Sequence, residues 1–472
     1  MCPPYAEIRT FVQHLTPTWR KPQHENFARL VGAVLERPTL CLSDLARAWP
    51  APAQPLHGRL KRLGRFLENP RLDELALASR WFKLSYRFGQ AVPGAPTDRP
   101  LLPILLDTTY FEPFAALIAA VPCGGRALPI ALTTYHRTTL EACFPPVATW
   151  PDPASPSPPA AHRGRPAMPA AAVVQRFTSQ PHIERRLIRL VWHLLSPALR
   201  GVLVADRGFA SADLFAWLRR HRRDFVIRID AATHVRLRPG GPSQPVAQAL
   251  TVRPGERRWA PGATYTQQAA VPVHLLAVWE PGQAEPWYLA TTLEHPAWTE
   301  TLYRWRMRLE SSNRDEKTGV LLRQGGDRHA LRNGLHLHRL LLAVLAAQWL
   351  CALVGLQAWR DLADPPRDTA LAEAPLTTPQ DSPLLEQGPA APPPAQPHRG
   401  PAPRVPAWMR RFAARGVLSY VRLGREVLLA PDLPHIVRRC VRWLGIYLWL
   451  WVPLWYPWQR RYRFRRWWAA AA

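Results

Sequence analysis

Four residues near position 310 carry side chains that could bind phosphate groups or a metal ion. They are Tyr303, Arg306, Glu310 and Lys317, at offsets of 0, 3, 7 and 14. At about 100° per residue all four would share one narrow stripe of a helix, roughly 21 Å long. A carboxylate, a phenol and two cations suit a row of backbone phosphates that leads to a metal ion. The alternative interpretation is an amphipathic helix with ordinary ion pairs.

Two further carboxylates follow short apolar runs. Residues 101–106 lead to Asp107, and residues 201–205 lead to Asp206. Such runs are typical of strands buried on both faces, and a carboxylate at the end of a buried strand is costly unless something pairs with it. Together with Glu310, the two aspartates could hold two Mg²⁺ ions, with Mn²⁺ as a substitute, and so cleave a phosphodiester. Two strands and a helix that deliver these groups indicate a ribonuclease H-like α/β core.

The same residues carry a family resemblance. Tyr-x2-Arg-x3-Glu-x6-Lys is the signature of the insertion-sequence-four type of bacterial DDE transposases, and Asp-Thr-Thr at 107–109 and Asp-Arg-Gly-Phe at 206–209 match its strand-end motifs. The chain resembles that family from about residue 10 to about residue 360. The resemblance implies an enzyme that binds terminal inverted repeats and catalyses strand cleavage and strand transfer on double-stranded DNA, by cut-and-paste through hairpin ends. A homodimer is expected in the DNA complex.

The chemistry and the resemblance also suggest residue roles. Asp107 would bridge both metal ions, while Asp206 and Glu310 would each complete one. Arg306 and Lys317 would grip phosphates, and Tyr303 would help to fix the cleaved strand. By resemblance, a tryptophan on a β-rich insertion receives a base that leaves the stack in the hairpin. Trp287 occupies that place, with plain packing as the alternative.

Two other functions share parts of this pattern. An inactive or domesticated transposase would bind repeat DNA as a repressor, and the unusual C-terminal tail favours this alternative. A structure-selective nuclease without strand transfer would use the same metal site, but it would not require the stripe that ends at Lys317. The complete signature favours the active enzyme.

The composition points to a polyanionic partner. The formal net charge is +27 and the sequence pI is about 11.1, although GC-rich coding accounts for part of the arginine excess. The six cysteines form no Cys-x-x-Cys pair, so neither a zinc site nor a disulfide framework is indicated. No basic region followed by an apolar run opens the chain. We expect a cytoplasmic bacterial protein, associated with the nucleoid when bound to DNA, with no membrane partner.

The first 95 residues are predicted to form a helical DNA-binding domain. Residues 56–67 read as a basic amphipathic helix that follows a proline-rich turn, as in a helix-turn-helix, with leucines 60, 63 and 67 inside. An ordinary helical bundle with a basic solvent face is the alternative. The candidate DNA-binding residues on the outer side are Arg59, Lys61, Arg62 and Arg65.

The rest of the chain divides by composition. The spacing between Asp206 and Glu310 is too long for a helix to follow directly, so an all-β insertion is expected between them. The apolar stretch 340–359 is predicted to be a buried helix, with a membrane span as the alternative. The tail is interpreted as an extension of the reading frame past an older stop, or else as a surface that adsorbs to membrane or DNA. The expected parts are a first core part at 96–230 with a flexible insertion at 144–172, a β-rich insertion at 231–293, the rest of the core at 294–360, a disordered linker at 361–404 and a Trp/Arg-rich tail at 405–472.

Overall fold

The computed structural model describes residues 4–50, 54–88, 100–123, 126–145, 173–196, 199–266, 269–317, 333–363, 420–430 and 434–450. Nearly all of the predicted flexible insertion and disordered linker, and residues 451–472 of the tail, lie outside these ranges. Within helix α9 (Pro296–Lys317), the side chains from residue 308 onward also lie outside the description.

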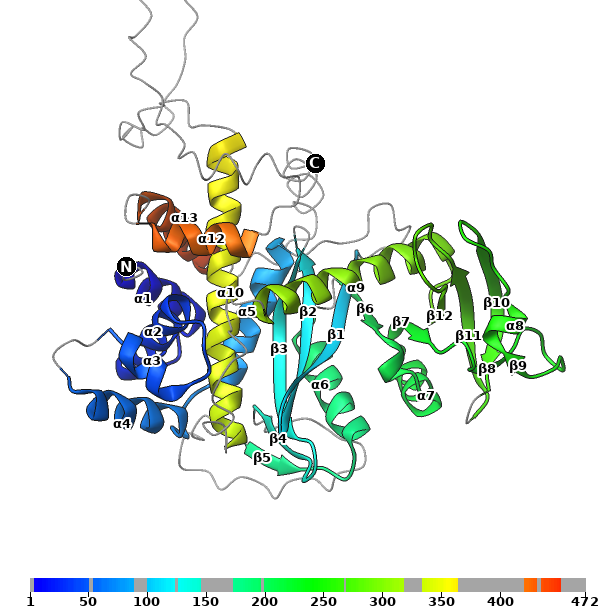
Figure 1. Ribbon diagram of the computed structural model, residues 1–472, viewed down its shortest axis with the longest axis horizontal. Coiled ribbons are helices and arrows are strands. Elements are labelled where there is room, and N and C mark those ends of the chain that lie inside the picture. The colour runs from blue at the N-terminus through cyan, green and yellow to red at the C-terminus, as the bar shows by residue number, and fades with distance from the viewer. Residues whose placement is uncertain are drawn as a thin grey trace, which may run out of the picture.

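One mixed sheet of twelve strands runs through the described residues (Figure 1). Its order is β5-β4-β3-β2-β1-β6-β7-β12-β11-β10-β8-β9. Strands β2 and β3 are antiparallel to their neighbours, whereas β6 pairs in parallel with β1, and β7 with β6. This central order, 3-2-1-6-7, is the one expected of a ribonuclease H-like core. The bounds are β1 Leu101–Phe111, β2 Phe114–Cys123, β3 Arg126–His136, β4 Glu141–Phe144, β5 Val173–Arg176, β6 Arg200–Ala205 and β7 Asp224–Ile229.

Strand β1 extends further than the sequence predicts. The apolar run stops at Leu106, but pairing with β2 continues through Asp107↔Ile118 to Phe111↔Phe114. Residues 108–111 are Thr-Thr-Tyr-Phe, and β-branched and aromatic residues fit a pleated strand as well as aliphatic ones do. Asp107 therefore lies within a strand rather than at its end.

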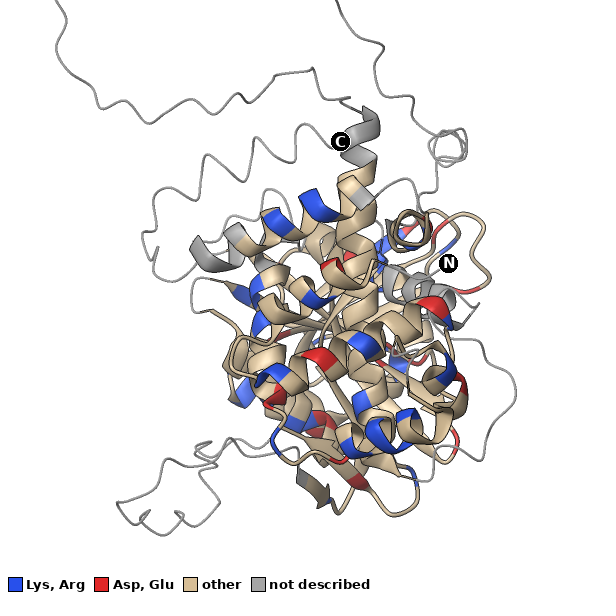
Figure 2. Cartoon of the chain, turned by 90° about the vertical axis from the view of Figure 1, so that its left-hand side faces the viewer, with Lys and Arg blue, Asp and Glu red and all other residues tan. Residues whose placement is uncertain are grey.

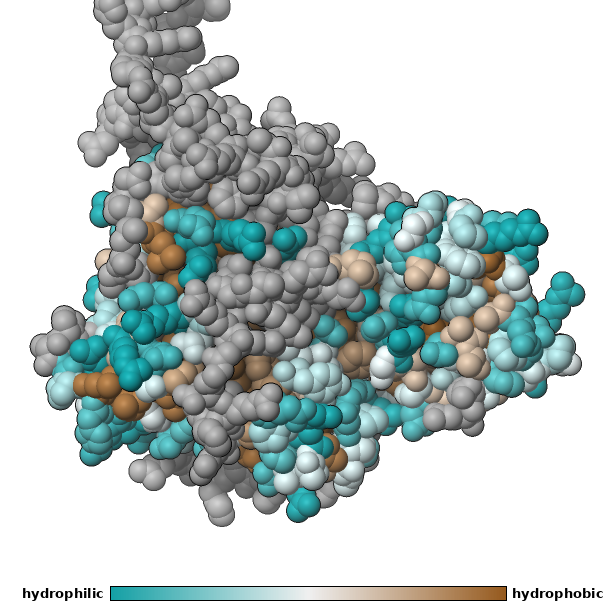
Figure 3. Space-filling view, viewed as in Figure 1, coloured by the Kyte–Doolittle hydropathy of each residue, from teal (hydrophilic) through white to brown (hydrophobic). Residues whose placement is uncertain are grey.

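The β-rich segment predicted at 231–293 continues the core sheet. Strand β12 pairs antiparallel with β7, with Ala290 opposite Ile227. The segment also contains a four-residue helix, α8, so it is not all-β. Hydrophilic residues cover much of this right-hand lobe on the face shown in Figure 3. The remaining elements are β8 His234–Arg236, β9 Gln244–Pro245, α8 Val246–Ala249, β10 Arg257–Tyr265, β11 Val271–Val278 and β12 Trp287–Thr291.

Helices cover both faces of the sheet. Helices α6 (Gln180–Leu194) and α7 (Ala212–Arg220) pack on the face that carries Leu203, Phe225 and Ile227. Helix α9 crosses the opposite face, where Tyr303 packs with residues of β1, β6 and β7 (Figure 1). The helix predicted from the four-residue stripe is confirmed, since α9 includes positions 303 to 317.

A long apolar helix, α10 (Gly334–Ala363), joins the sheet to a second group of helices (Figure 1). Within the described residues, α10 is the one helix that is long enough and apolar enough to cross a membrane. However, 89% of its apolar window is buried inside the protein. This burial agrees with the predicted core helix. The N-terminal helices around it are α1 Tyr5–Leu15, α2 Lys21–Glu36, α3 Leu42–Ala48, α4 Leu56–Leu67 and α5 Glu74–Phe88.

Part of the tail belongs to the same helical core. Helices α12 (Tyr420–Leu429) and α13 (Pro434–Leu450) pack on α10 and α1. A Cβ atom on Gly424 would lie 1.7 Å from the carbonyl oxygen of Cys351, so only glycine allows α12 to approach α10 this closely. Arg425 also donates to the carbonyl of Leu35 at 3.3 Å, in the last turn of α2. Residues 420–429 and 434–444 therefore pack as structural helices, in contrast to the predicted unselected extension.

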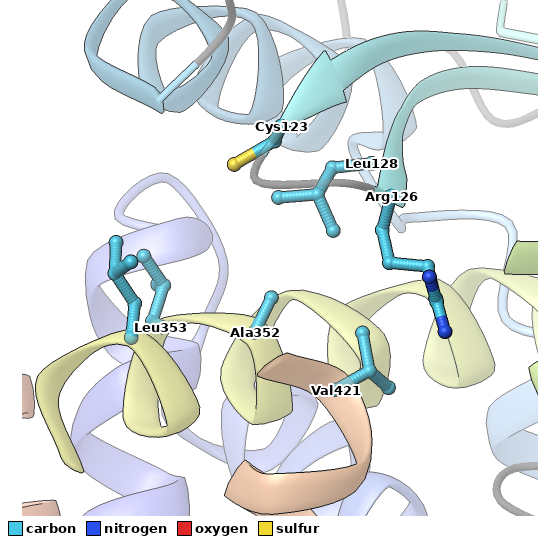
Figure 4. A pocket seen from close by; sticks show the side chains of 7 residues that line it. Cys123, Arg126, Leu128, Ala352, Leu353 and Val421 are labelled. Atoms are coloured by element: carbon cyan, nitrogen blue, oxygen red, sulfur yellow. The ribbon is translucent and has the colours of Figure 1, made fainter. Parts of the chain in front are cut away.

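A small apolar hollow marks where three parts of the chain meet (Figure 4). Leu128 and Cys123 come from the β2–β3 hairpin, Ala352 and Leu353 from α10, and Val421 from α12. The hollow shows that the tail helix completes the seam between sheet and helices. Its lining offers little that could bind a polar ligand apart from Arg126.

Candidate active site

The two predicted aspartates lie side by side on neighbouring strands. The parallel pairing of β1 with β6 ends at Leu106↔Ala205, and the next residues are Asp107 and Asp206. Neighbouring strands lie about 4.8 Å apart, so the two backbones are adjacent at this level. Leu105 and Val204 belong to the cluster that packs against α9. Because side chains alternate along a strand, Asp107 and Asp206 belong to the same α9-facing side.

Helix α9 places two residues of the stripe against Asp206. The hydroxyl of Tyr303 donates to Oδ1 of Asp206 at 3.3 Å, and Nη1 of Arg306 lies 3.8 Å from Oδ2. Tyr303 is fully buried and Arg306 is 4% exposed. The guanidinium of Arg306 also lies 5.4 Å from the centre of the Tyr303 ring. These contacts fix the Asp206 carboxylate from two directions.

Burial keeps Tyr303 in its donor form. Desolvation is the main reason why the pKa of Tyr303 is raised to about 12; the charge of Arg306 lowers it, and the nearby Asp206 carboxylate raises it. The phenol therefore keeps its proton at neutral pH and donates to Asp206. Its role in the structure is to orient that carboxylate.

For the other two residues of the stripe, Glu310 and Lys317, the structure describes the backbone position only. Glu310 lies four residues beyond Arg306 on α9, and Lys317 ends the helix. A spacing of four keeps Glu310 on the same helix face as Arg306. Among the residues whose side chains are described, no group of three or more His, Cys, Asp or Glu gathers at one point. Glu310, the expected third carboxylate, lies outside that set.

One charged residue at the site was missed by sequence reasoning. Ile227 of β7 pairs with Ala205 of β6, so Arg228 is the neighbour of Asp206 in the next strand. Its side chain is largely buried and lies 2.5 Å from Glu285. Asp107, Asp206 and Arg228 thus occupy one level across three parallel strands. The available signal was an arginine in the middle of the apolar strand 225–229.

The comparison with known families gives one match, which covers part of the chain. Residues 179–350 match the family described as transposase DDE domain. This stretch of the chain resembles a transposase DDE domain. No curated protein matches the chain. The matched residues run from α6 into α10 and include Asp206 and Glu310, whereas Asp107 lies upstream of them.

The DDE domain accounts for the fold and the activity class. Its core is ribonuclease H-like, in agreement with the strand order. The protein is an enzyme of DNA transposition that cleaves DNA and transfers strands in the cytoplasm, and DDE transposases generally use divalent metal ions. Carboxylates on adjacent strands beside a third acidic position on α9 are hard oxygen donors of the kind that Mg²⁺ and Mn²⁺ prefer.

Burial changes the roles assigned to two signature residues and to Trp287. The sequence suggests direct contact with DNA for Tyr303, Arg306 and Trp287, but all three are at most 5% exposed. The Trp287 ring packs edge-on against Tyr303, with ring centres 5.1 Å apart. In the DDE domain as folded here, these residues form the layer that holds Asp206. DNA could reach them only after side chains move.

An ion-pair network fixes α9 to the β-rich lobe. Arg257 of β10 binds Glu300 through two hydrogen bonds of 2.7 and 2.9 Å, and Arg304 contacts both Glu300 and Glu280. Burial raises the pKa of Glu300, but Arg257 and Arg304 outweigh it and lower the pKa below its ordinary value. Glu300 is therefore ionised at neutral pH. The network positions the first half of the helix that carries Glu310.

The predicted DNA-reading helix of the N-terminal region is α4. Figure 2 looks onto this helical side, where Lys and Arg outnumber Asp and Glu. Lys61 and Arg65 are exposed, as predicted. Arg59 instead donates to the carbonyls of Gln54 and Arg47, and Arg62 donates to Asn26 at 2.9 Å. Arg59 serves helix packing, because carbonyls near the end of α3 need donors, and Arg62 links α4 to Asn26 of α2.

Proposed function

We propose that the protein is a transposase of the insertion-sequence-four type, which binds terminal inverted repeats and moves its element by cut-and-paste through hairpin ends. The supporting observation is the contact of Asp206 with Tyr303 and Arg306, two of the four signature residues. The signature thus lies against a strand-end carboxylate of the DDE domain.

The donor set fits a two-metal site. Asp107, Asp206 and Glu310 would hold two Mg²⁺ ions, or Mn²⁺ in their place. Such ions supply an activated water and neutralise the charge that builds up on the phosphate. Tyr303 keeps Asp206 oriented through its hydroxyl, and Arg306 offsets the charge of that carboxylate. The freed 3′-hydroxyl of the cut strand would then attack the second strand or the target.

Two cations at the edge of the site would hold the DNA backbone. Arg228 lies beside Asp206 on the neighbouring strand β7, and Lys317 is the last residue of the stripe on α9. Phosphate contacts of this kind position a strand without reading its sequence. Lys61 and Arg65 on α4 would contact the inverted repeat, and the enzyme would act as a homodimer on paired ends.

Trp287 would receive the base that leaves the stack in the hairpin. Flipping a base costs a few kcal/mol, and stacking on an aromatic ring returns roughly 1 to 3 kcal/mol. Because the ring is covered here, side chains packed around Trp287 must move when the hairpin forms. Trp287→Ala should spare first-strand nicking and slow hairpin formation, and an abasic site at the flipped position should partly restore the rate. Equal loss of both steps would assign Trp287 to packing alone.

A product assay tests the proposal as a whole. Purified protein is incubated with Mg²⁺, a repeat-end duplex labelled on each strand in turn, and a supercoiled target plasmid. The proposed transposase gives nicks, hairpins and joined products. A nuclease without strand transfer gives nicks only, and a repressor gives only a mobility shift. Either of the last two results would refute the proposal.

A further inference from the structure

We propose that a second DNA-binding surface lies on the face of the sheet opposite α9, at the end of the strands away from Asp206. The surface, called here the α6–α7 arginine surface, would hold a duplex that does not enter the carboxylate site. Helices α6 and α7 end where β6 and β7 begin, whereas Asp206 follows the last residue of β6. Six strand residues separate the two ends by roughly 20 Å. The arginines of the surface are Arg185, Arg186, Arg189, Arg219, Arg220, Arg222 and Arg223.

Positive charge dominates this surface. Arg219, Arg220 and Arg222 are exposed, and the other four are half-buried. The acidic neighbours have limited effect: Asp224 pairs with Arg200 at 2.5 Å, and burial raises the pKa of Glu184. Asp213 is exposed and lies 3.9 Å from Arg185. The surface therefore keeps a large excess of cations.

The arginines around His221 also disfavour a further positive charge on its imidazole. His221 lies between the exposed arginines at the end of α7. Burial lowers the pKa of His221, and the charges of Arg223, Arg189 and Arg220 lower it further. A site that repels one more proton in this way attracts anions.

Arg223 adds a fixed positive charge to the surface. Its Cζ lies 4.6 Å from the ring centre of Trp217 and 5.3 Å from that of Trp192, so the guanidinium is stacked against aromatic faces. Its Nη1 is buried and has no hydrogen-bond partner among the described residues. Burial and the charge of Arg189 lower the pKa of Arg223 to about 10, which leaves it charged at neutral pH. The stacked Arg223 guanidinium therefore adds fixed positive charge beside the exposed Arg219, Arg220 and Arg222, which can contact phosphates.

Arg222 occupies a backbone position that favours glycine. Its φ is 52°, in the left-handed region, and its N–H donates to the carbonyl of Arg219 at 2.9 Å to end the helix. Arginine here is less favourable for the turn than glycine would be. Such a residue persists where its side chain is used. Helix-dipole effects explain Arg219 and Arg220, but not Arg222 and Arg223, which lie past the helix end.

The arrangement fits duplex DNA better than a small anion. The cations extend from successive turns of α6, at Arg185 and Arg189, to the end of α7. An extended row of arginines matches repeated phosphates, whereas a single small anion needs one pocket. The enzyme acts on DNA, and the bound duplex would be flanking or target DNA.

The salt dependence of DNA binding tests this surface in the full-length protein. The affinity for a random-sequence duplex is measured by fluorescence anisotropy across a KCl series. Each phosphate contact adds about 0.9 to the slope of log affinity against log salt. We expect Arg222→Gly to lower the slope by about 0.9, and the double variant Arg219→Ala/Arg222→Gly by about twice that. Arg253→Gly, at an exposed arginine of the β-rich lobe, is the matched control and should not change it.

Arg222→Gly separates binding from folding, because glycine fits the left-handed turn. Its unfolding midpoint should equal or exceed that of the parent, so a lower slope would reflect a lost contact. An unchanged slope in both variants, or an equal loss in the Arg253 control, would overturn the proposal. The proposal would also be overturned if the variants lost binding to polyglutamate but kept the parental salt dependence of DNA binding. The partner of the surface would then be an acidic protein. Cleavage of a short repeat-end duplex reports the proposed function separately.

Discussion

At the scale of single residues, the hydroxyl of Tyr303 is the part of the signature with the clearest contact. It donates to Asp206, and burial keeps it protonated. We expect Tyr303→Phe to lower the rate of DNA cleavage about ten-fold, because a hydrogen bond to a charged group is worth about 1.5 kcal/mol or more. Tyr288→Phe is the control, since Tyr288 is a buried tyrosine of β12 that packs on the other face of the sheet. Equal losses in the two variants would contradict a specific role.

A second residue-scale prediction concerns the buried carboxylate of Glu74. It lies 3.0 Å from Nε2 of His338 and 2.9 Å from Nε of Arg339. Removal of one partner from a buried ionic group costs about 3 to 5 kcal/mol. Glu74→Gln should therefore lower the free energy of unfolding by that amount in urea titrations at neutral pH. A loss below about 1 kcal/mol would show that the network contributes little.

The same network predicts a pH dependence. Burial alone would raise the pKa of Glu74, but His338 and Arg339 lower it below its ordinary value. Because the folded pKa is the lower one, the stabilisation is present above the unfolded pKa of about 4.3 and is lost as the pH falls toward the folded value. Unfolding free energies measured across this acid range should fall less steeply in Glu74→Gln than in the parent. Parallel pH curves would count against this assignment.

The sequence alone identified those site residues whose role depends on residue type and spacing. Asp206, Tyr303 and Arg306 stand out because polar groups at those positions have few structural uses, and the fold places them in contact. It could not anticipate that Arg59 would serve backbone carbonyls, since that depends on where α3 ends. Arg228 was missed because its importance comes from the neighbouring strand.

At the scale of elements, glycine determines how closely the tail helix packs. A Cβ on Gly424 would overlap the backbone of Cys351, whereas a Cβ on Gly64 of α4 would meet nothing within 4 Å. We expect Gly424→Ala to destabilise the protein by about 3 kcal/mol or more, because backbone atoms cannot give way. Gly64→Ala should instead stabilise it by about 0.5 to 1 kcal/mol. Chemical unfolding of both variants tests the pair, and a neutral Gly424→Ala would refute this packing.

Elements were predictable where a local pattern specifies them. The apolar runs located the first part of β1 and all but the first residue of β6, and the charged stripe located α9. The pairing of β12 with β7 was not predictable, because a strand's partner lies outside its own sequence. For the same reason the sequence indicated a β-rich insertion at 231–293 but not the pairing of its strand β12 with the core strand β7.

At the scale of the whole molecule, the tail completes the helical core. Apolar side chains of α12 and α13 lie in the cluster shared by α1, α2 and α10. Each buried apolar side chain contributes about 1.5 to 3 kcal/mol, and a typical protein has only about 5 to 15 kcal/mol of net stability. Removal of residues 420–472 should therefore prevent stable folding, as measured by soluble yield and a cooperative melting transition. Removal of residues 451–472 alone should leave both intact.

A fully folded product after removal of residues 420–472 would support the interpretation of the tail as an unselected extension.

The shared helical core also affects the choice of tests for DNA recognition. Deletion of residues 1–95 would uncover the apolar surface of α10, so loss of function would be ambiguous. Point variants at the exposed Lys61 and Arg65 are the sharper test of repeat-end preference.

The central claim, that Asp206 belongs to the catalytic site of the DDE domain, is tested most directly by Asp206→Asn. The variant keeps the size of the side chain and its ability to accept from Tyr303, but it removes the charge that a metal ion requires. Cleavage of a labelled repeat-end duplex in Mg²⁺ and DNA binding by mobility shift are measured on the same preparation. We predict that cleavage is lost while binding stays within about two-fold of the parent. Cleavage at the parental rate would contradict the account.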